Sequence, residues 1–169
     1  MTFISSLPNI PEFRLPEIVR RVNQRLPQWP HALSLCLAIN SALRLKILPE
    51  DALSLCAERS FRVVVEDGGT EALFTCRAGR FCPIWRKDAD TPVDVTFRGE
   101  LHAYLRLLTR QDDPDTLFFK RQLSIEGDTE LGLAIKNLLD AIDWPPPFLA
   151  RLLDRLRPMP SPAGADVKK

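Results

Sequence analysis

The sequence predicts an α+β fold with a single five-stranded sheet that helices cover on one face. Three observations predict it. Apolar residues recur at helical spacing near both ends of the chain, and five segments between residues 61 and 126 alternate or are rich in β-branched residues. The elements follow the order helices, antiparallel meander, fourth strand, helical connection, fifth strand and closing helix, which is typical of a one-sheet α+β domain.

Residues 1–30 form an N-terminal extension, with an extended lead-in through residue 13 and a basic amphipathic helix after it. Its apolar residues recur at helical spacing at Leu15, Ile18, Val19, Val22 and Leu26. The other faces carry Arg14, Arg20, Arg21 and Arg25. Two interpretations stay open. The helix lies in an anionic membrane interface, with these arginines in contact with lipid, or it packs on the domain with a solvated arginine face.

The domain itself is expected over residues 31–144. Residues 31–48 predict a long apolar helix ended by Pro49, and residues 50–57 a short one. Three strands follow at 61–66, 71–77 and 80–86, because the turns Asp67-Gly68-Gly69 and Ala78-Gly79 separate them. These strands form the meander.

After a polar loop at 87–92, residues 93–97 alternate as a half-buried strand, and residues 99–110 return to helical spacing. A helical turn at 115–119 and a fifth strand at 122–126 precede the closing helix. Gly127 suits a tight turn, and Asp128 stands where a helix N-cap belongs. Beyond it, we expect a C-terminal amphipathic helix within 145–157 and a disordered tail at 158–169.

Composition excludes several functions. The formal net charge of the 169-residue chain is +1, which gives no overall field for nucleic acid, so no nucleic-acid partner is expected. The apolar stretch 33–48 is too short and too polar to span a bilayer. The N-terminus lacks the basic and apolar regions of a signal peptide, so we expect a cytoplasmic protein.

The four cysteines do not indicate a metal centre. Cys36, Cys56, Cys76 and Cys82 form no C-x-x-C pair, and only two histidines are present to join them. We therefore predict neither metal nor cofactor, and reduced thiols that behave as small apolar residues. A Cys76–Cys82 bridge across a hairpin is the alternative.

The corner between the fifth strand and the closing helix allows three interpretations. Phosphate binding is disfavoured because Asp128 and Glu130 would repel an anion at the helix start. Catalysis would use Glu126, Asp128, Glu130 or His102, yet no nucleophile elbow or paired carboxylate accompanies them. The third interpretation is an apolar ligand, and helical periodicity alone does not distinguish a filled core from a hollow one.

The segment IEGDTELGLAIKNLLDAID, with DPDTLFFKRQL before it, resembles the C-terminal signature of the sterol-carrier-protein-2 family of lipid-binding domains. Within that family it is most similar to a bacterial accessory factor of oxygen-independent ubiquinone biosynthesis. The match is specific over residues 113–143, and PVDVTFRGELHAYLRLL fits the family's strand-to-helix pattern. The resemblance implies that the helices and sheet enclose an apolar cavity that holds a lipid unaltered. The lining positions it implies are Phe97, Leu101, Leu105, Leu117, Phe118, Leu131, Ile135 and Leu138.

The resemblance also implies partners. They are an isoprenoid lipid or phospholipid and the enzymes of ubiquinone biosynthesis, including the peptidase-family iron–sulfur hydroxylase proteins. Such a carrier is not an enzyme, and it works in the cytoplasm or at the periphery of the inner membrane. Two alternatives stay open: an interaction module that assembles these enzymes without hosting a lipid, and an enzyme that uses Glu126 or His102.

Overall fold

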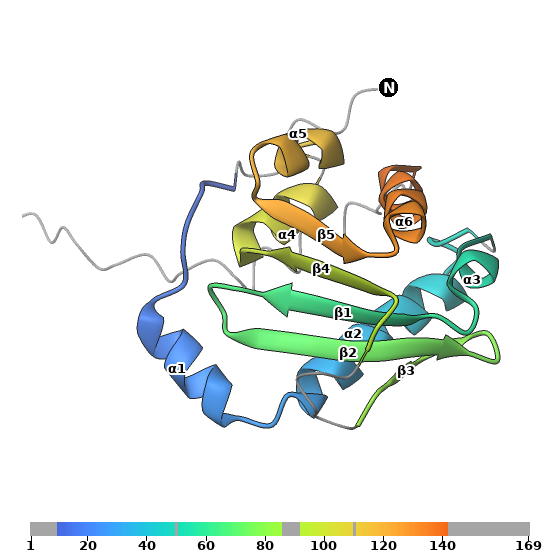
Figure 1. Cartoon of the computed structure of the whole chain (residues 1–169), viewed down its shortest axis with the longest axis horizontal. Helices are drawn as coiled ribbons and strands as arrows, with labels where there is room; N and C mark the ends of the chain where they lie inside the picture. The colour runs from blue at the N-terminus through green and yellow to red at the C-terminus, as the bar shows by residue number, and fades with distance from the viewer. Residues whose placement is uncertain (1–9, 50, 86–91, 110, 142–169) are drawn as a thin grey trace, which may run out of the picture.

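One mixed sheet of five strands organises the chain in the computed structural model, which describes residues 10–49, 51–85, 92–109 and 111–141 (Figure 1). The strands are β1 (Ser60–Val65), β2 (Thr70–Arg77), β3 (Arg80–Pro83), β4 (Val95–Gly99) and β5 (Leu123–Gly127). Their order across the sheet is β3-β2-β1-β4-β5. Only the β1–β4 pair is parallel; the other pairs are antiparallel. The predicted single five-stranded sheet is confirmed.

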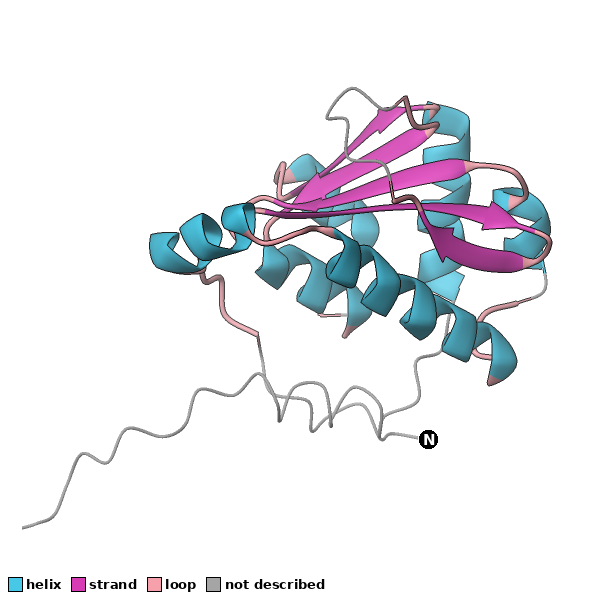
Figure 2. Ribbon diagram, turned by 90° about the horizontal axis from the view of Figure 1, so that it is seen from below, coloured by secondary structure: helices cyan, strands magenta, loops and turns pink. Residues whose placement is uncertain are grey.

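Six helices are described: α1 (Glu17–Arg25), α2 (Trp29–Arg44), α3 (Asp51–Cys56), α4 (Leu101–Leu108), α5 (Pro114–Phe119) and α6 (Thr129–Ala141). The long helix α2 packs against β2 and β3, and Figure 2 shows it beneath the sheet. Helix α6 packs on β4 and β5 and touches α3, while α5 packs beside α4 on β5. No described helix has the length and apolar character needed to cross a bilayer.

Strand alternation gives the sheet one apolar face. Phe61 on β1 lies opposite Phe74 on β2 and Val95 on β4, and all three are buried. Phe61 and Phe74 stack at 5.4 Å between ring centroids. The next residue along β1, Arg62, points to the other face, as does Glu126 on β5. The helices therefore cover the apolar face, and the opposite face is mixed, because it also carries the buried Leu73, Thr75 and Thr96.

Buried apolar side chains on the covered face form two clusters. The main core consists of Cys36, Cys56, Phe61, Phe74, Cys76, Phe81, Val95 and Leu131. A second cluster consists of Ala103, Leu117 and Leu123, with Tyr104, Leu107 and Phe118 packed on it. The helices α4 and α5 thus have their own core, separate from the one beneath α2 and α6.

Several element boundaries differ from the sequence-based prediction. Strand β3 ends at Pro83 rather than Arg86, although the backbone N–H of Ile84 still donates to the carbonyl oxygen of Leu73 at 2.9 Å. Helix α2 begins at Trp29 rather than His31, with Pro30 in its first turn. Strand β4 begins at Val95 rather than Val93, and the carboxylate of Asp94 just before it accepts hydrogen bonds from Ser60. The predicted C-terminal helix and tail lie outside the described residues.

The positions of Cys76 and Cys82 in the sheet decide whether these two cysteines can form a disulfide. Cys82 lies opposite Thr75 and Cys76 opposite Phe81, so the side chains of Cys76 and Cys82 project from opposite faces of the sheet. Cys76 is buried, and Cys82 is exposed. The alternative disulfide between them is therefore wrong, because a bridge needs both sulfur atoms on one side.

Candidate functional site

The corner between β5 and α6 is built by backbone chemistry. Gly127 has φ +96°, and a Cβ there would lie 2.3 Å from the carbonyl oxygen of Asp94. The backbone N–H of Asp128 donates to that same oxygen at 2.8 Å. Asp128 Oδ1 then accepts the N–H of Leu131 at 3.0 Å, which makes Asp128 the N-cap of α6. The predicted roles of Gly127 and Asp128 are confirmed.

A polar network fixes this corner to the sheet. Both the backbone N–H and the hydroxyl of Ser60 donate to Asp94 Oδ2, at 2.8 and 2.6 Å. These hydrogen bonds hold the pKa of Asp94 below its usual range, and Arg59, 3.1 Å away, adds to the effect. Arg59 also lies 3.8 Å from Asp128. The carboxylates of Asp94 and Asp128 therefore position the start of α6. They also occupy the place that a bound phosphate would need.

Helix α6 is anchored closely at its first turns and loosely beyond them. A Cβ on Gly132 would lie 2.4 Å from Ile125 Cγ2, so the helix backbone approaches β5 as only glycine allows. Leu131 and Gly132 are the only buried residues of α6 among those described. Ile135, Leu138 and Leu139 form the same apolar stripe further along but are only half-buried. The distal half of α6 therefore contributes a half-buried apolar face, with Ile135 packed on the main core.

The α4–α5 pair forms the wall opposite α6. Asp113 caps α5 by accepting the N–H of Thr116 at 2.7 Å, and Pro114 occupies the first helical position. Leu117 of α5 is fully buried in the second cluster. An ion pair joins the two walls, from Lys136 on α6 to Asp115 on α5.

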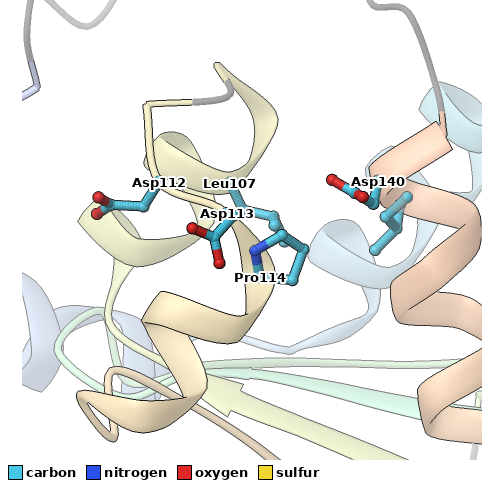
Figure 3. Close-up of a pocket in the computed structure, with 6 residues that line it drawn as sticks. Leu107, Asp112, Asp113, Pro114 and Asp140 are labelled. Carbon is cyan, nitrogen blue, oxygen red and sulfur yellow. The ribbon is translucent and has the colours of Figure 1, made fainter.

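A hollow of about 160 Å³ lies between the two walls (Figure 3). Its lining comes from the α4–α5 side and from the last turn of α6, and consists of Leu107, Asp112, Asp113, Pro114, Leu139 and Asp140. Figure 3 shows Pro114 on the side toward α6, whereas the Asp113 carboxylate points away from α6. Lipid and drug-sized ligands occupy pockets of roughly 300 to 1,000 Å³. In this arrangement, the hollow is therefore smaller than a lipid tail needs.

The eight predicted lining residues divide between the two walls and the sheet. Phe97, Leu131 and Ile135 belong to or pack on the main core. Leu117 and Phe118 belong to or pack on the second cluster, and Leu105 is buried on α4. Leu101 and Leu138 are half-buried. None of the eight lines the hollow between α6 and the α4–α5 pair, and their role as a lipid lining stays a prediction.

None of the six residues that line the hollow is among those eight, and two of the six, Leu139 and Leu107, are leucines. Leu139 extends the apolar stripe of α6, which the sequence shows. Leu107 follows Ala103 by one helical turn and packs with Phe118 on the second cluster. The sequence shows that Leu107 lies within a segment of helical spacing. The repeat of Leu101, Leu105 and Leu108, however, predicted that a neighbouring face of the same helix is the apolar one.

A second, more polar hollow of about 460 Å³ lies by the lead-in to α1 and the α5–β5 turn. Its lining includes the buried His102, whose Nδ1 is 3.3 Å from Glu100 Oε2. Glu126 is not part of this lining and forms an ion pair with Arg98, at 3.1 Å. The two side chains named in the enzyme hypothesis therefore do not share this hollow. Within the described ranges, no group of histidine, cysteine and acidic residues is arranged to hold a metal ion.

The fold and the site define a one-sheet α+β domain whose helical walls meet over an apolar layer. Residues 39–140 match the sequence model of the SCP-2 sterol transfer family, and the chain belongs to this family. The family expected from residues 113–143 is thereby confirmed.

Curated relatives include the ubiquinone biosynthesis accessory factor UbiT of Escherichia coli strain K12, which is 40% identical over 100 residues. That alignment covers 49% of this chain and 55% of the relative, so the chain spans about half the length of the curated relatives it matches. UbiT of Escherichia coli O157:H7 matches with the same identity and coverage.

Solved structures include a UbiJ-SCP2 ubiquinone synthesis protein, with 18% identity and a TM-score of 0.49 over 63% of this chain and 93% of that one. Apo sterol carrier protein 2 of Yarrowia lipolytica has 12% identity and a TM-score of 0.40, over 53% of this chain and 72% of that one.

Proposed function

We propose that this protein is a non-enzymatic lipid carrier that serves oxygen-independent ubiquinone biosynthesis. The observation that carries the proposal is the 40% identity to UbiT within a chain of the SCP-2 sterol transfer family. Its ligand is an isoprenoid quinone precursor or another lipid, and its tail lies between α6 and the α4–α5 pair. The lipid is held there and is not chemically altered.

The energetics of a polyprenyl tail favour such a host. Burying apolar surface contributes about 25 cal/mol per Å², so a tail that exposes several hundred Å² leaves a membrane slowly without a carrier. Aliphatic walls are sufficient for this task, and the half-buried Ile135, Leu138 and Leu139 provide one. Delivery then brings the lipid to soluble enzymes of the pathway, which include the peptidase-family iron–sulfur hydroxylase proteins.

Loading requires the space between the two walls to widen from about 160 Å³. The distal half of α6 has no buried side chain among its described residues, whereas Leu131 and Gly132 anchor the proximal half. An outward movement of the distal half breaks the Lys136–Asp115 ion pair and the packing of Ile135 on the main core, and it moves no fully buried side chain of the described part of α6. The N-cap and the close contact of Gly132 keep the helix attached to the sheet.

The test is genetic. Deleting the gene in its own host is expected to lower ubiquinone during growth without oxygen, and the intact gene on a plasmid is expected to restore it. Normal ubiquinone in the deletion strain without oxygen contradicts the proposal.

The second candidate is an interaction module that assembles the biosynthetic enzymes without a lipid. The small volume of the hollow favours this function, since a filled layer has no room for a tail. A variant that no longer holds lipid separates the two. An interaction module supports ubiquinone synthesis with such a variant, and a carrier does not.

A further inference from the structure

Large apolar side chains are exposed together where α1 leads into α2. Ile18 and Val22 on α1 are 69% and 52% exposed, and Leu26 and Trp29 are each 48% exposed. Trp85 follows β3 and is 65% exposed, with its ring centroid 6.0 Å from that of Trp29. We name these five residues the α1–Trp surface. The remaining exposed large apolar side chains of the described chain lie on or beside α2, α5 and α6.

Helix α1 is attached to the domain along its opposite side. The backbone N–H of Leu15 donates to Asp67 Oδ2 at 3.0 Å, and the amide of Asn23 donates to the carbonyl oxygen of Gly68 at 2.9 Å. Both partners belong to the β1–β2 turn. These contacts hold α1 beside the β1–β2 turn (Figure 1), and Ile18 and Val22 stay exposed.

The four arginines around α1 have different surroundings. Arg14 forms an ion pair with Glu100 at 2.8 Å, and the side chain of Arg20 packs over Gly69 in the β1–β2 turn. Arg21 and Arg25 instead follow Ile18 and Val22 by three residues, so they flank the exposed apolar side. Arg21 pairs only with the exposed Glu17 of its own helix, at 3.2 Å, and Arg25 has no ionic partner in the described part of the chain.

We propose that the α1–Trp surface docks on an anionic lipid bilayer, with Arg21 and Arg25 on lipid phosphates. Tryptophan rings favour the boundary between head groups and acyl chains, where one edge is apolar and the other is wet. Aliphatic side chains beside them enter shallowly, and flanking arginines add electrostatic attraction. This combination of cations and apolar groups fits a bilayer of negative charge better than a neutral apolar partner.

The docking does not depend on the carrier function. If the protein also carries lipid, the contact brings it to the membrane that contains the lipid. Docking is measured on vesicles without ubiquinone precursors, whereas carriage is measured by lipid retained in solution. Failure of one therefore leaves the other intact.

Vesicle flotation of the full chain tests the charge component. Vesicles that contain phosphatidylglycerol are expected to bind the protein, and pure phosphatidylcholine vesicles to bind it weakly. Arg21→Glu/Arg25→Glu is expected to weaken binding about tenfold or more. The matched control is Arg77→Glu/Arg80→Glu at the β2–β3 turn, which makes the same change in net charge with exposed residues outside the surface. The proposal is overturned if wild-type protein does not float with anionic vesicles, or if the control weakens binding equally.

Fluorescence tests the apolar component without depending on charge variants. In a Trp144→Phe background, the emission comes from Trp29 and Trp85 alone, since the chain has three tryptophans. Vesicles with brominated acyl chains are expected to quench this emission, because short-range quenching requires the rings to enter the interface. Emission that stays unquenched while the protein floats places another surface on the bilayer and overturns the assignment.

Discussion

Replacing Leu138 by asparagine tests the proposed lipid site on α6. Leu138 is half-buried in the apolar stripe of α6, and it precedes Leu139, which lines the hollow. Full burial of a leucine side chain contributes about 1.5 to 3 kcal/mol, so a tail that completes the burial of a half-buried leucine gains about 1 kcal/mol from it. A polar amide in its place removes this gain and leaves an amide without a hydrogen-bonding partner against the tail, a total loss of about 1 to 2 kcal/mol.

The expected result is a five- to thirtyfold rise, roughly, in the Kd of a fluorescent isoprenoid probe. Urea unfolding of the same variant gives the fraction folded, which separates lost affinity from lost structure. The matched control is Leu133→Asn on the same helix, because Leu133 is exposed and lies two residues from the buried Leu131, on the far side of α6. A folded Leu138→Asn protein with wild-type affinity, or equal losses in both variants, would refute the proposed lining.

Three further predictions concern the scaffold of the site. Gly132→Ala is expected to lower the free energy of unfolding by about 1 to 3 kcal/mol, because a Cβ there overlaps β5; urea unfolding unchanged from wild type contradicts the close contact. At neutral pH, a thiol reagent is expected to modify the exposed Cys82 rapidly and the buried cysteines slowly, since burial raises the pKa of Cys36 to about 12. Equal rates of modification in the native protein would contradict this prediction. Because hydrogen bonds from Ser60 lower the pKa of folded Asp94, its contribution to stability is complete above the unfolded pKa and is lost as pH falls through the folded value. Asp94→Asn is therefore expected to flatten the acid limb of the stability curve, and an unchanged limb in chemical denaturation argues against the network.

Local chemistry made the β5–α6 corner predictable. A glycine followed by an aspartate, just before an apolar helical stripe, predicts a residue with positive φ and then a helix N-cap. Both predictions depend only on residues that are neighbours in the sequence. The structure adds the partner, the carbonyl oxygen of Asp94, which lies far away in the sequence. The parallel pairing of β1 with β4 was not predictable in the same way, because strand order depends on the packing of all the elements together.

The space between the two helical walls could not be predicted from the sequence, for a related reason. Periodicity places Leu131, Ile135 and Leu138 on one stripe, but it does not tell how far that stripe stands from α5. That distance depends on the anchoring of α6 at Gly132 and on the separate core beneath Leu117. Resemblance to a family supplied the expectation of a cavity, and the described hollow is small.

Helix α1 shows the same division between local pattern and tertiary structure. Its apolar stripe and its arginines were evident from spacing, yet the two interpretations of the helix could not be separated. The structure shows that one side packs on the β1–β2 turn while Ile18 and Val22 are exposed. The contact between Trp29 and Trp85 joins distant segments, and no sequence pattern signals it.

Native mass spectrometry of the purified protein, followed by organic extraction, tests the carrier proposal most directly. The expected result is a population with the added mass of one lipid, from which extraction recovers an isoprenoid or a phospholipid. A mass equal to the bare chain, unchanged after incubation with vesicles that contain ubiquinone precursors, contradicts the carrier function and favours the interaction module.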